Sequence, residues 1–440
     1  MKRIKKSAAV CVCFCLTLLM VASTNVSAAE SEQSKSDSKW ETQKSITISQ
    51  NDVRYYAYLS KDKKESWIYK IDPIKKVKKL VIPKKIKAAS VTRIGFGAEL
   101  YADGSDYFVS VFGDSLEPWH NLYGTHLKKK NVITEIVFPK TVKDIEIGAF
   151  SGMKRLEKVH IPDKVKTIPR YSFSACDSLK EVTFPKNLRE IDTNAFAVSF
   201  QIKSLSISKG AKKYTVDNDI LIDKTKKCMV WVASGKKNVT IPDRVTRIAD
   251  YAFQASRAKT VYIPKSIKEI GKEALTAKKI RNVSLDGDNP VYAMKNHCIY
   301  TKKDGTLVAV LVKGLKIQIP NSVKIMGENV SVMGKLEADD DEIVDDEKRF
   351  SVHIPSSVKK VIERWMFFDL SVEVYFHGKK PPKIESKCSG SEYTALPINN
   401  SVYVPKGAKK TYIKWAKDRD GLTWEDLHVF DEQQIDKTNS

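Results

Sequence analysis

Cysteine is scarce in this chain, which contains seven in 440 residues. Three of them lie before residue 16, and the other four are spread along the rest of the chain: Cys176, Cys228, Cys298 and Cys388. Four cysteines are too few for a disulfide scaffold, and no Cys-x-x-Cys or Cys/His metal spacing is present. We therefore expect free thiols, no structural metal and no cofactor.

The sequence also lacks the local patterns that carry catalysis. It has no serine nucleophile elbow, no glycine-rich phosphate loop and no His-Glu-x-x-His, and it has no nucleic-acid-binding motif. We expect a protein that is not an enzyme and has no catalytic residues. A glycan hydrolase remains an unfavoured alternative, because carboxylates that meet only in space cannot be seen in a sequence.

Long apolar runs are missing after the first thirty residues. The chain starts with basic MKRIKK, continues with an apolar stretch and reaches VSAAE, which is the pattern of a secretory signal peptide. We assign 1–28 to it, with cleavage after Ala28 or Ala29. The alternative is an uncleaved anchor, but the run Ala8–Ala22 is short for a membrane span. We expect a secreted, extracellular protein with no membrane span in the mature chain.

Basic residues outnumber acidic ones, 76 to 53, which gives a formal net charge of +23. Cleavage after Ala28 would remove four basic residues and no acidic one, which leaves +19. Such a charge favours anionic surfaces, including an anionic cell-wall polymer. The basic residues are spread along the chain, however, which also fits a plain solvated surface.

A repeat dominates the rest of the sequence. Seven times an apolar residue precedes proline: Pro139, Pro162, Pro185, Pro242, Pro264, Pro320 and Pro355. Aliphatic residues or methionine follow three and six positions after each proline. The clean unit is 23 residues long, and a fixed period of this length indicates a stacked solenoid.

The position eleven residues after each proline is mostly aromatic. It reads Phe150, Phe173, Phe196, Phe253, Leu275, Ser331 and Met366. We expect the phenylalanines to form a buried spine, with each ring contributing about 1.5–3 kcal/mol. Ser331 breaks this column, so we expect the array to decay in the sixth repeat.

A short strand is predicted ahead of each proline. In LEKVHIP, Leu156, Val159 and Ile161 point one way, while Lys158 and His160 point the other. The proline ends the strand, because it cannot donate to a ladder. Stacking these strands predicts a parallel sheet along one wall of the solenoid.

Two longer spacings interrupt the array and resemble each other. Each contains a hairpin-like pair, YTVDNDILIDKTKKCMVWVA and VYAMKNHCIYTKKDGTLVAVLV, with turns expected at DKTKK and KKDGT. The remaining boundaries follow from composition. We assign 29–50 to a flexible N-terminal segment, 51–78 to an N-terminal cap and 79–376 to the solenoid. The solenoid contains an irregular insert at 96–131 and an acidic loop at 336–349. Residues 377–440 are assigned to a C-terminal repeat end with a capping helix.

These patterns resemble the BspA-like, or Treponema-type, leucine-rich repeats of bacterial secreted and surface proteins. The resemblance rests on FPKTVKDIEIGAFSGMKRL, IPDKVKTIPRYSFSACDSL and IPDRVTRIADYAF, and on the ending VYVPKGAKKTYIKW. It covers about residues 79–416. It implies a β-rich, mixed α/β leucine-rich repeat horseshoe with parallel strands, two hairpin-like insertions and terminal caps. It also implies an extracytoplasmic binding or adhesion role, with no catalytic residues to carry over.

The solvent-facing strand positions are the main candidate site. One column gives the ligand-binding candidates His160, Thr183, Ser206, Thr240, Tyr262, Ser284, Gln318, His353 and Tyr375, with Tyr403 after them. The next column reads Lys158, Glu181, Ser204, Asn238, Thr260, Asn282, Lys316, Ser351 and Glu373. Hydroxyls, amides and tyrosines on a rigid sheet suit recognition of a protein or glycan. The alternative is a hydrated face without a ligand, on which the two histidines are surface polar groups.

Three other segments have two interpretations each. The aromatic residues of 96–131 either pack on the cap, as part of a decayed repeat, or contact a partner. The acidic run 337–348 is expected to be a solvated loop, since it lacks the spacing of a calcium loop, and a calcium-binding loop is the alternative. The stretch AKKTYIKWAKDRD is expected to be a helix that covers the last coil, and a membrane-binding helix is the alternative.

These observations support two main hypotheses of function. The first is a secreted, non-catalytic scaffold that binds an extracellular protein or glycan through its sheet face, as in adhesion or host and community interaction. The second is a basic, wall-associated structural protein that is held by charge without a specific ligand.

Overall fold

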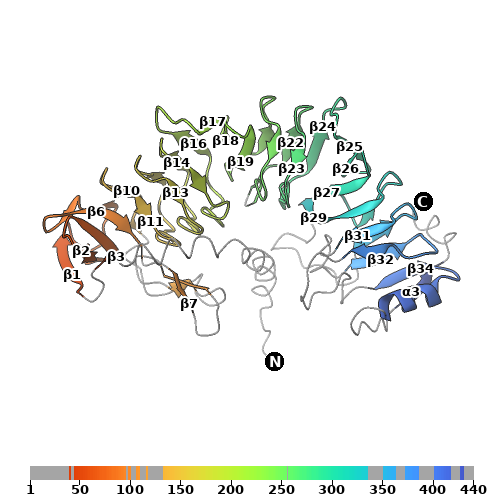
Figure 1. Ribbon diagram of the computed structural model, residues 1–440, viewed down its shortest axis with the longest axis horizontal. Coiled ribbons are helices and arrows are strands. Elements are labelled where there is room, and N and C mark those ends of the chain that lie inside the picture. The colour runs from red at the N-terminus through yellow and green to blue at the C-terminus, as the bar shows by residue number, and fades with distance from the viewer. Residues whose placement is uncertain are drawn as a thin grey trace. The chain divides into compact units, whose positions relative to one another are not determined.

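The structure is a computed structural model. It describes residues 39–40, 44–95, 98–100, 106–109, 115–116, 132–254, 256–334, 350–362, 372–385, 401–417 and 427–430. Two compact units are distinguished, Met1–Lys226 with Val230–Lys236, and Lys227–Met229 with Lys237–Ser440. Each unit is a β-solenoid built from short strands (Figure 1). Helix is confined, within the residues described, to α3 (Lys409–Lys417).

The first unit begins with an antiparallel cap, as predicted. It consists of β1 (Ile46–Gln50), β2 (Val53–Leu59) and β3 (Glu65–Pro73). The predicted boundary is wrong, because β1 lies inside the segment expected to be flexible. Asn51 and Asp52 both have positive φ, 51° and 60°, which is the conformation of a tight two-residue hairpin turn. That turn folds the sequence ITISQ back onto β2.

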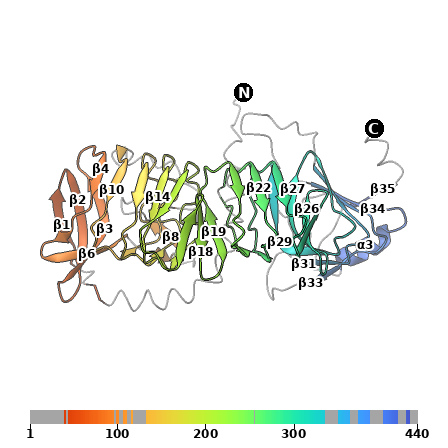
Figure 2. The ribbon, with the colours of Figure 1, turned by 90° about the horizontal axis from the view of Figure 1, so that it is seen from above.

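One wall of the first unit is a parallel sheet, formed by the strands that precede the prolines. Its members are β4 (Lys79–Val81), β10 (Glu135–Val137), β12 (Lys158–His160), β14 (Glu181–Phe184) and β16 (Ser204–Ile207). Neighbouring strands pair in parallel register, and Figure 2 shows β4, β10 and β14 side by side. In β12 the side chain of Val159 is buried, whereas Lys158 and His160 are exposed. The predicted alternation is therefore confirmed.

A second set of strands follows the prolines on another side of the first unit. It contains β5 (Lys85–Ile86), β6 (Ala89–Ile94), β11 (Asp144–Ile145), β13 (Thr167–Ile168) and β15 (Glu190–Ile191). β3, β6 and β11 are joined in parallel, as are β13 and β15. These short strands place the aliphatic residue six positions after each proline in the core.

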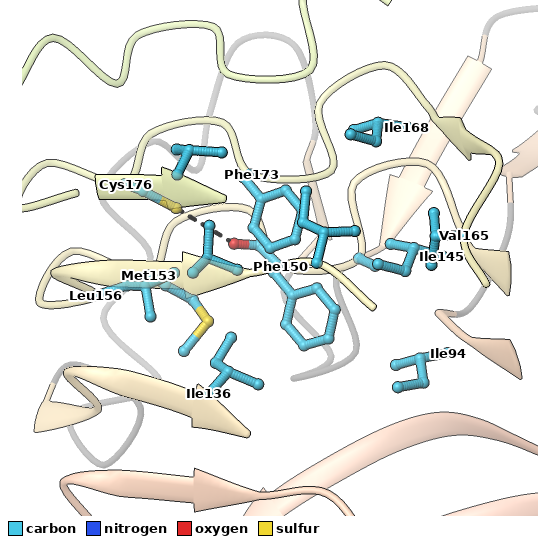
Figure 3. Close-up of a cluster of buried hydrophobic side chains, with 14 of the residues drawn as sticks. Ile94, Ile136, Ile145, Phe150, Met153, Leu156, Val165, Ile168, Phe173 and Cys176 are labelled. Atoms are coloured by element: carbon cyan, nitrogen blue, oxygen red, sulfur yellow. Dashed lines mark hydrogen bonds between the residues drawn. The ribbon is translucent and has the colours of Figure 1, made fainter. Parts of the chain in front are cut away.

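The predicted phenylalanine spine forms the centre of this core. Phe150 and Phe173 stack with ring centroids 5.5 Å apart, and Phe173 and Phe196 are 5.6 Å apart. Figure 3 shows the first two rings together with Met153 and Cys176 of the same cluster. Trp231 continues the stack after Phe196 at 5.1 Å, so the first hairpin insertion supplies the fourth ring.

The second unit repeats the proline-preceding wall in two sheets. The first sheet contains β20 (Asn238–Thr240), β22 (Thr260–Ile263) and β24 (Asn282–Leu285). The second contains β28 (Lys316–Gln318), β30 (Phe350–Ile354), β32 (Val372–Phe376), β34 (Val402–Pro405) and β35 (Leu427–Phe430). The single continuous sheet that we expected is therefore wrong, since β24 and β28 are not paired and the second insertion lies between them in the chain.

Both predicted insertions are β-hairpins. The first contains β17 (Tyr214–Asp217) and β18 (Ile220–Asp223), followed by β19 (Cys228–Val232). The second contains β25 (Tyr292–Lys295), β26 (Cys298–Thr301) and β27 (Thr306–Val312). Their tight turns lie at Asn218–Asp219 and Asn296–His297, all four with positive φ. The predicted turns DKTKK and KKDGT are the following connections, from β18 to β19 and from β26 to β27.

The wall after the prolines continues in the second unit. It includes β21 (Arg247–Ile248), β23 (Glu269–Ile270), β29 (Ile325–Gly334), β31 (Lys360–Ile362) and β33 (Lys383–Glu385). β29 pairs in parallel with β27 and β31. The sixth repeat departs from the pattern, as expected, because a long strand replaces the turn there, but the stack of parallel strands continues from β29 to β31. Ser331 is fully buried, and its hydroxyl accepts a hydrogen bond from the Leu275 backbone N–H at 3.1 Å.

The insert 96–131 has its own antiparallel strands, β7 (Ala98–Leu100), β8 (Asp106–Val109) and β9 (Ser115–Leu116). At the C-terminal end the predicted helix is confirmed as α3, whose Tyr412 is fully buried against Phe376. The helix does not end the fold, because β35 follows it and pairs with β34.

Several predictions lie outside the described residues: the signal peptide, the packing of the aromatic insert, the acidic run 337–348, Met366 and Cys388. Within the described part of the chain, no helix is long and apolar enough to cross a membrane. The same part contains no group of three or more His, Cys, Asp or Glu side chains that could hold a metal ion. Cys176, Cys228 and Cys298 are buried free thiols.

Candidate functional site

The predicted site residues lie in register on the proline-preceding strands. They form three separate ladders rather than one: His160–Thr183–Ser206, Thr240–Tyr262–Ser284, and Gln318–His353–Tyr375, which continues to Tyr403 and His428. The neighbouring predicted column is in register in the same three sheets. The sequence therefore predicted correctly which side chains stand opposite one another on adjacent strands.

The first two ladders consist mainly of short polar groups that bond to one another. The hydroxyls of Thr183 and Ser206 are 2.9 Å apart. Tyr262 is an exposed tyrosine, and its hydroxyl donates to an Asp286 oxygen at 3.1 Å. In the neighbouring column, Thr260 donates to the Asn238 amide oxygen at 2.9 Å. These groups are ordered by local bonds but provide little aromatic contact area.

The third ladder is a continuous stack of rings, which we call the ring ladder: His353, Tyr375, Tyr403 and His428. The centroid distances along it are 4.6, 4.3 and 4.9 Å, and the first two pairs are nearly parallel, at 9° and 7°. The spacing follows from the strand separation, because residues in register on paired strands are about 5 Å apart. Parallel pairing of identical positions thus aligns the rings face to face.

Glu373 fixes the two tyrosine hydroxyls at one side of the ring ladder. Tyr375 donates to Glu373 Oε2 at 3.0 Å, and Tyr403 donates to Oε1 at 3.3 Å. Burial and then the charge of Glu373 raise the pKa of the Tyr375 phenol. The Tyr375 phenol therefore remains a hydrogen-bond donor at physiological pH, and the carboxylate holds both rings in one orientation.

His353 departs from the sequence prediction of a surface polar group. Only 4 % of it is exposed, because Tyr375 covers one ring face and His377 lies against it. His353 Nδ1 and His377 Nε2 are 3.0 Å apart, so one ring donates and the other accepts. Burial, followed by the positive charge of Lys316 and by His377, lowers the pKa of His353 to about 4. The imidazole at this end of the ladder is neutral at pH 7.

Sequence reasoning missed His377 and His428. His377 directly follows β32, at a position where the predicted strand had ended. His428 lies in β35, beyond the helix that we expected to end the fold. The alternating sequence LHVF was a strand signal, and its histidine occupies the position that histidine or tyrosine takes in the preceding strands.

The site as a whole is suited to contact rather than to covalent chemistry. Inner ring faces of the ladder are covered by the adjacent rings, so edges, hydroxyls and the terminal ring are available to a partner. The imidazole of His353 bonds to a second histidine, His377, and stacks against Tyr375. The arrangement combines rigid aromatic area with directional hydrogen-bond groups, which is the composition of recognition surfaces.

The fold defines the class of protein, a leucine-rich repeat solenoid. Six copies of the family model described as "BspA type Leucine rich repeat region" match residues 126–218 and 233–306. Within these residues the repeats are BspA-type leucine-rich repeats, as the resemblance in the sequence implied. No curated protein matches the chain.

Solved structures of bacterial leucine-rich repeat proteins are similar at low identity. A leucine-rich cell surface protein from Faecalibacterium prausnitzii is 15% identical, with a TM-score of 0.35, and the match covers 78% of this chain and 96% of that one. The pneumococcal vaccine antigen PcpA is 16% identical, with a TM-score of 0.41 and coverages of 88% and 98%. A leucine-rich repeat protein from Eubacterium ventriosum is 15% identical, with a TM-score of 0.36 and coverages of 73% and 88%.

Proposed function

We propose that this protein is a secreted or cell-surface, non-catalytic binding scaffold that recognises an extracellular macromolecule through a strand face of its solenoid. The observation that carries the proposal is the ring ladder with its fixed tyrosine hydroxyls. Its binding surface lies on the sheet formed by β28, β30, β32, β34 and β35. The predicted signal peptide supports an extracellular location.

The geometry of the ring ladder favours a protein partner over a glycan. Sugar rings bind best on open aromatic faces, but the inner faces of the ladder are already stacked against each other. Ring edges and hydroxyls instead form a strip along four strands. Because the strands hold this strip rigid, little side-chain entropy is lost when a flat or extended protein segment contacts it.

Binding can be tested by pull-down of the secreted chain with extracellular matrix proteins, a glycan panel and bacterial cell walls, washed at rising salt. We expect retention of a protein partner above a few hundred millimolar salt, where screening removes charge-only attachment. The double variant Tyr375→Ala/Tyr403→Ala should lose that partner. Tyr262→Ala, which removes an exposed tyrosine from a different sheet, is the matched control.

Loss in the control alone would move the site to the sheet formed by β20, β22 and β24 and overturn the assignment to the ring ladder. Retention of glycans but of no protein would overturn the choice of partner class.

Attachment to an anionic wall polymer by charge is the second candidate function. The formal net charge of +23 favours it. Release from every surface at modest salt, with no effect of the tyrosine substitutions, would support this candidate in place of the first.

A further inference from the structure

Lysines are concentrated on another wall of the second unit, the one formed by the strands that follow the prolines. On the strands that follow the prolines, each residue faces a residue of the next strand, and in three strand pairs the facing residues are compatible in charge: Arg93 with Asp144, Thr167 with Glu190, and Arg247 with Glu269. The last of these pairs is an ion pair at 2.9 Å. In β31 and β33, by contrast, Lys360 stands directly opposite Lys383.

Two further lysines extend this like-charge pair. The backbone N–H of Lys359 donates to the carbonyl of Lys324 at 2.8 Å, and that of Lys383 donates to Lys359 at 2.8 Å. These bonds place the lysines on three successive coils. Lys324, Lys359 and Lys383 are exposed, and Lys360 is half-buried. We call these four residues the lysine cluster.

The nearby carboxylates do not neutralise the cluster. In 350–362 and 372–385 the only acidic residues are Glu373 and Glu385. Glu373 accepts the two tyrosine hydroxyls of the ring ladder, and Glu385 pairs with Lys360. On the preceding coil, Asp304 accepts hydrogen bonds from Thr301 and Thr306. Within the described residues, Lys324, Lys359 and Lys383 have no ion-pair partner.

Like charges directly opposite each other in a sheet destabilise it, so this arrangement costs folding free energy unless an anion offsets it. We propose that the lysine cluster binds a linear polymer of phosphate groups. Three coils span about 10 Å at the usual strand spacing, which is more than one phosphate can contact but suits a chain of them. Lysine binds phosphate as a flexible point charge, whereas arginine imposes a fixed fork, and the cluster contains no arginine.

This site is separate from the ring ladder, because its residues lie on β29, β31, β33 and the turns that precede them. The two proposals can therefore fail independently. Binding of long-chain inorganic polyphosphate and of a glycerol phosphate polymer to the full secreted chain would be measured by calorimetry over a range of salt, with heparin as a sulfated polymer of similar charge density. The test variant is Lys324→Gln/Lys359→Gln/Lys383→Gln. The control, Lys166→Gln/Arg189→Gln/Lys268→Gln, removes the same charge from other coils, at the position four residues after proline that Lys324 and Lys359 occupy in their own repeats.

We expect the test variant to raise the Kd for both phosphate polymers at least about 10-fold and the control to change it less than about 2-fold. Equal loss in the two variants would show attachment by net charge and overturn the site. Equal effects on heparin would overturn the phosphate assignment. A separate variant, Lys383→Glu, places opposite charges on facing residues and should raise the melting temperature while weakening polyphosphate binding. Unchanged binding by this folded variant would also overturn the proposal.

Discussion

The phenylalanine spine and the ring ladder are both stacks of rings contributed by successive coils, but the spine lies in the core of the first unit and the ring ladder on a strand wall of the second unit. In the spine, Phe150, Phe173 and Phe196 are fully or almost fully buried, and their edges meet other apolar side chains. In the ring ladder, Tyr375 and Tyr403 are half-buried, and their hydroxyls bond to Glu373. The same repeat geometry therefore stabilises the fold when the rings face inward and leaves a polar, accessible strip when they face outward.

The largest expected effect comes from breaking the spine. Phe173→Ala should lower the free energy of unfolding by about 3–5 kcal/mol, because it leaves a cavity between two stacked rings. Urea unfolding of the full chain would measure the loss. The control Phe200→Ala removes a ring that is 40% exposed and should cost less than about 1 kcal/mol. Equal losses in the two variants would contradict the role of the spine.

Lowering the pH should reduce stability through the ring ladder rather than through the spine, because His353 belongs to the ladder. The pKa of His353 is about 4 in the folded chain against 6.5 for an ordinary histidine, so below pH 6.5 the unfolded state binds the extra proton. Stability should therefore fall by about 2–3 kcal/mol between pH 6.5 and pH 4, and this contribution should level off below pH 4.

Calorimetry at several pH values would measure this change. His353→Gln should flatten the profile in that window. A second decline below pH 4.5 is expected from Glu65, because Lys39, Thr92 and Lys143 hold the pKa of its carboxyl at about 2. An unchanged profile for His353→Gln would contradict the burial of this ring.

Removing one ring from the ladder should cost less than removing one from the spine. Tyr375→Ala should lower the free energy of unfolding by about 1–2 kcal/mol, since each aromatic pair contributes about 0.5–1.5 kcal/mol beyond its area and the site is partly hydrated. The same urea titration would measure it. A loss as large as that of Phe173→Ala would mean that the ring ladder is a second core rather than an accessible surface.

The smallest expected effect concerns the buried cysteines, whose thiols should not react with an alkylating reagent in the folded chain. Cys176 contacts the spine, where its thiol donates to the Phe150 carbonyl at 3.5 Å, and burial raises the pKa of Cys298 to about 12. In a Cys388→Ser background without the signal peptide, the three buried thiols should not react with iodoacetamide at pH 8 until urea is added. Mass spectrometry would follow the labelling, and a mass two protons lower before reduction would reveal a disulfide.

Much of the fold could be predicted because the repeat encodes it locally. The proline column marked where the strands end, and the alternation around Val159 identified the buried side. The same period gave the register of His160 with Thr183 and of His353 with Tyr375, because residues one repeat apart must face each other in a parallel stack. The hairpin insertions were predicted as well, although their tight turns at Asn218–Asp219 and Asn296–His297 were not.

Other features depend on what surrounds a residue after folding. The outward position of His353 was predicted, but its burial was not, since the covering rings of Tyr375 and His377 come from the next coil. Ser331 looked like a break in the spine, but a backbone N–H from Leu275 satisfies its hydroxyl. Trp231 completes the spine, but it lies in an insertion and does not occupy the position eleven residues after a proline.

The sequence by itself determined the period, the strand faces and the order of side chains along each ladder, because these depend only on residue spacing and strand geometry. The tertiary structure decided which outward side chains are buried, which charges are neutralised and where the sheets separate. Those properties depend on neighbours that the chain brings together only when successive coils stack.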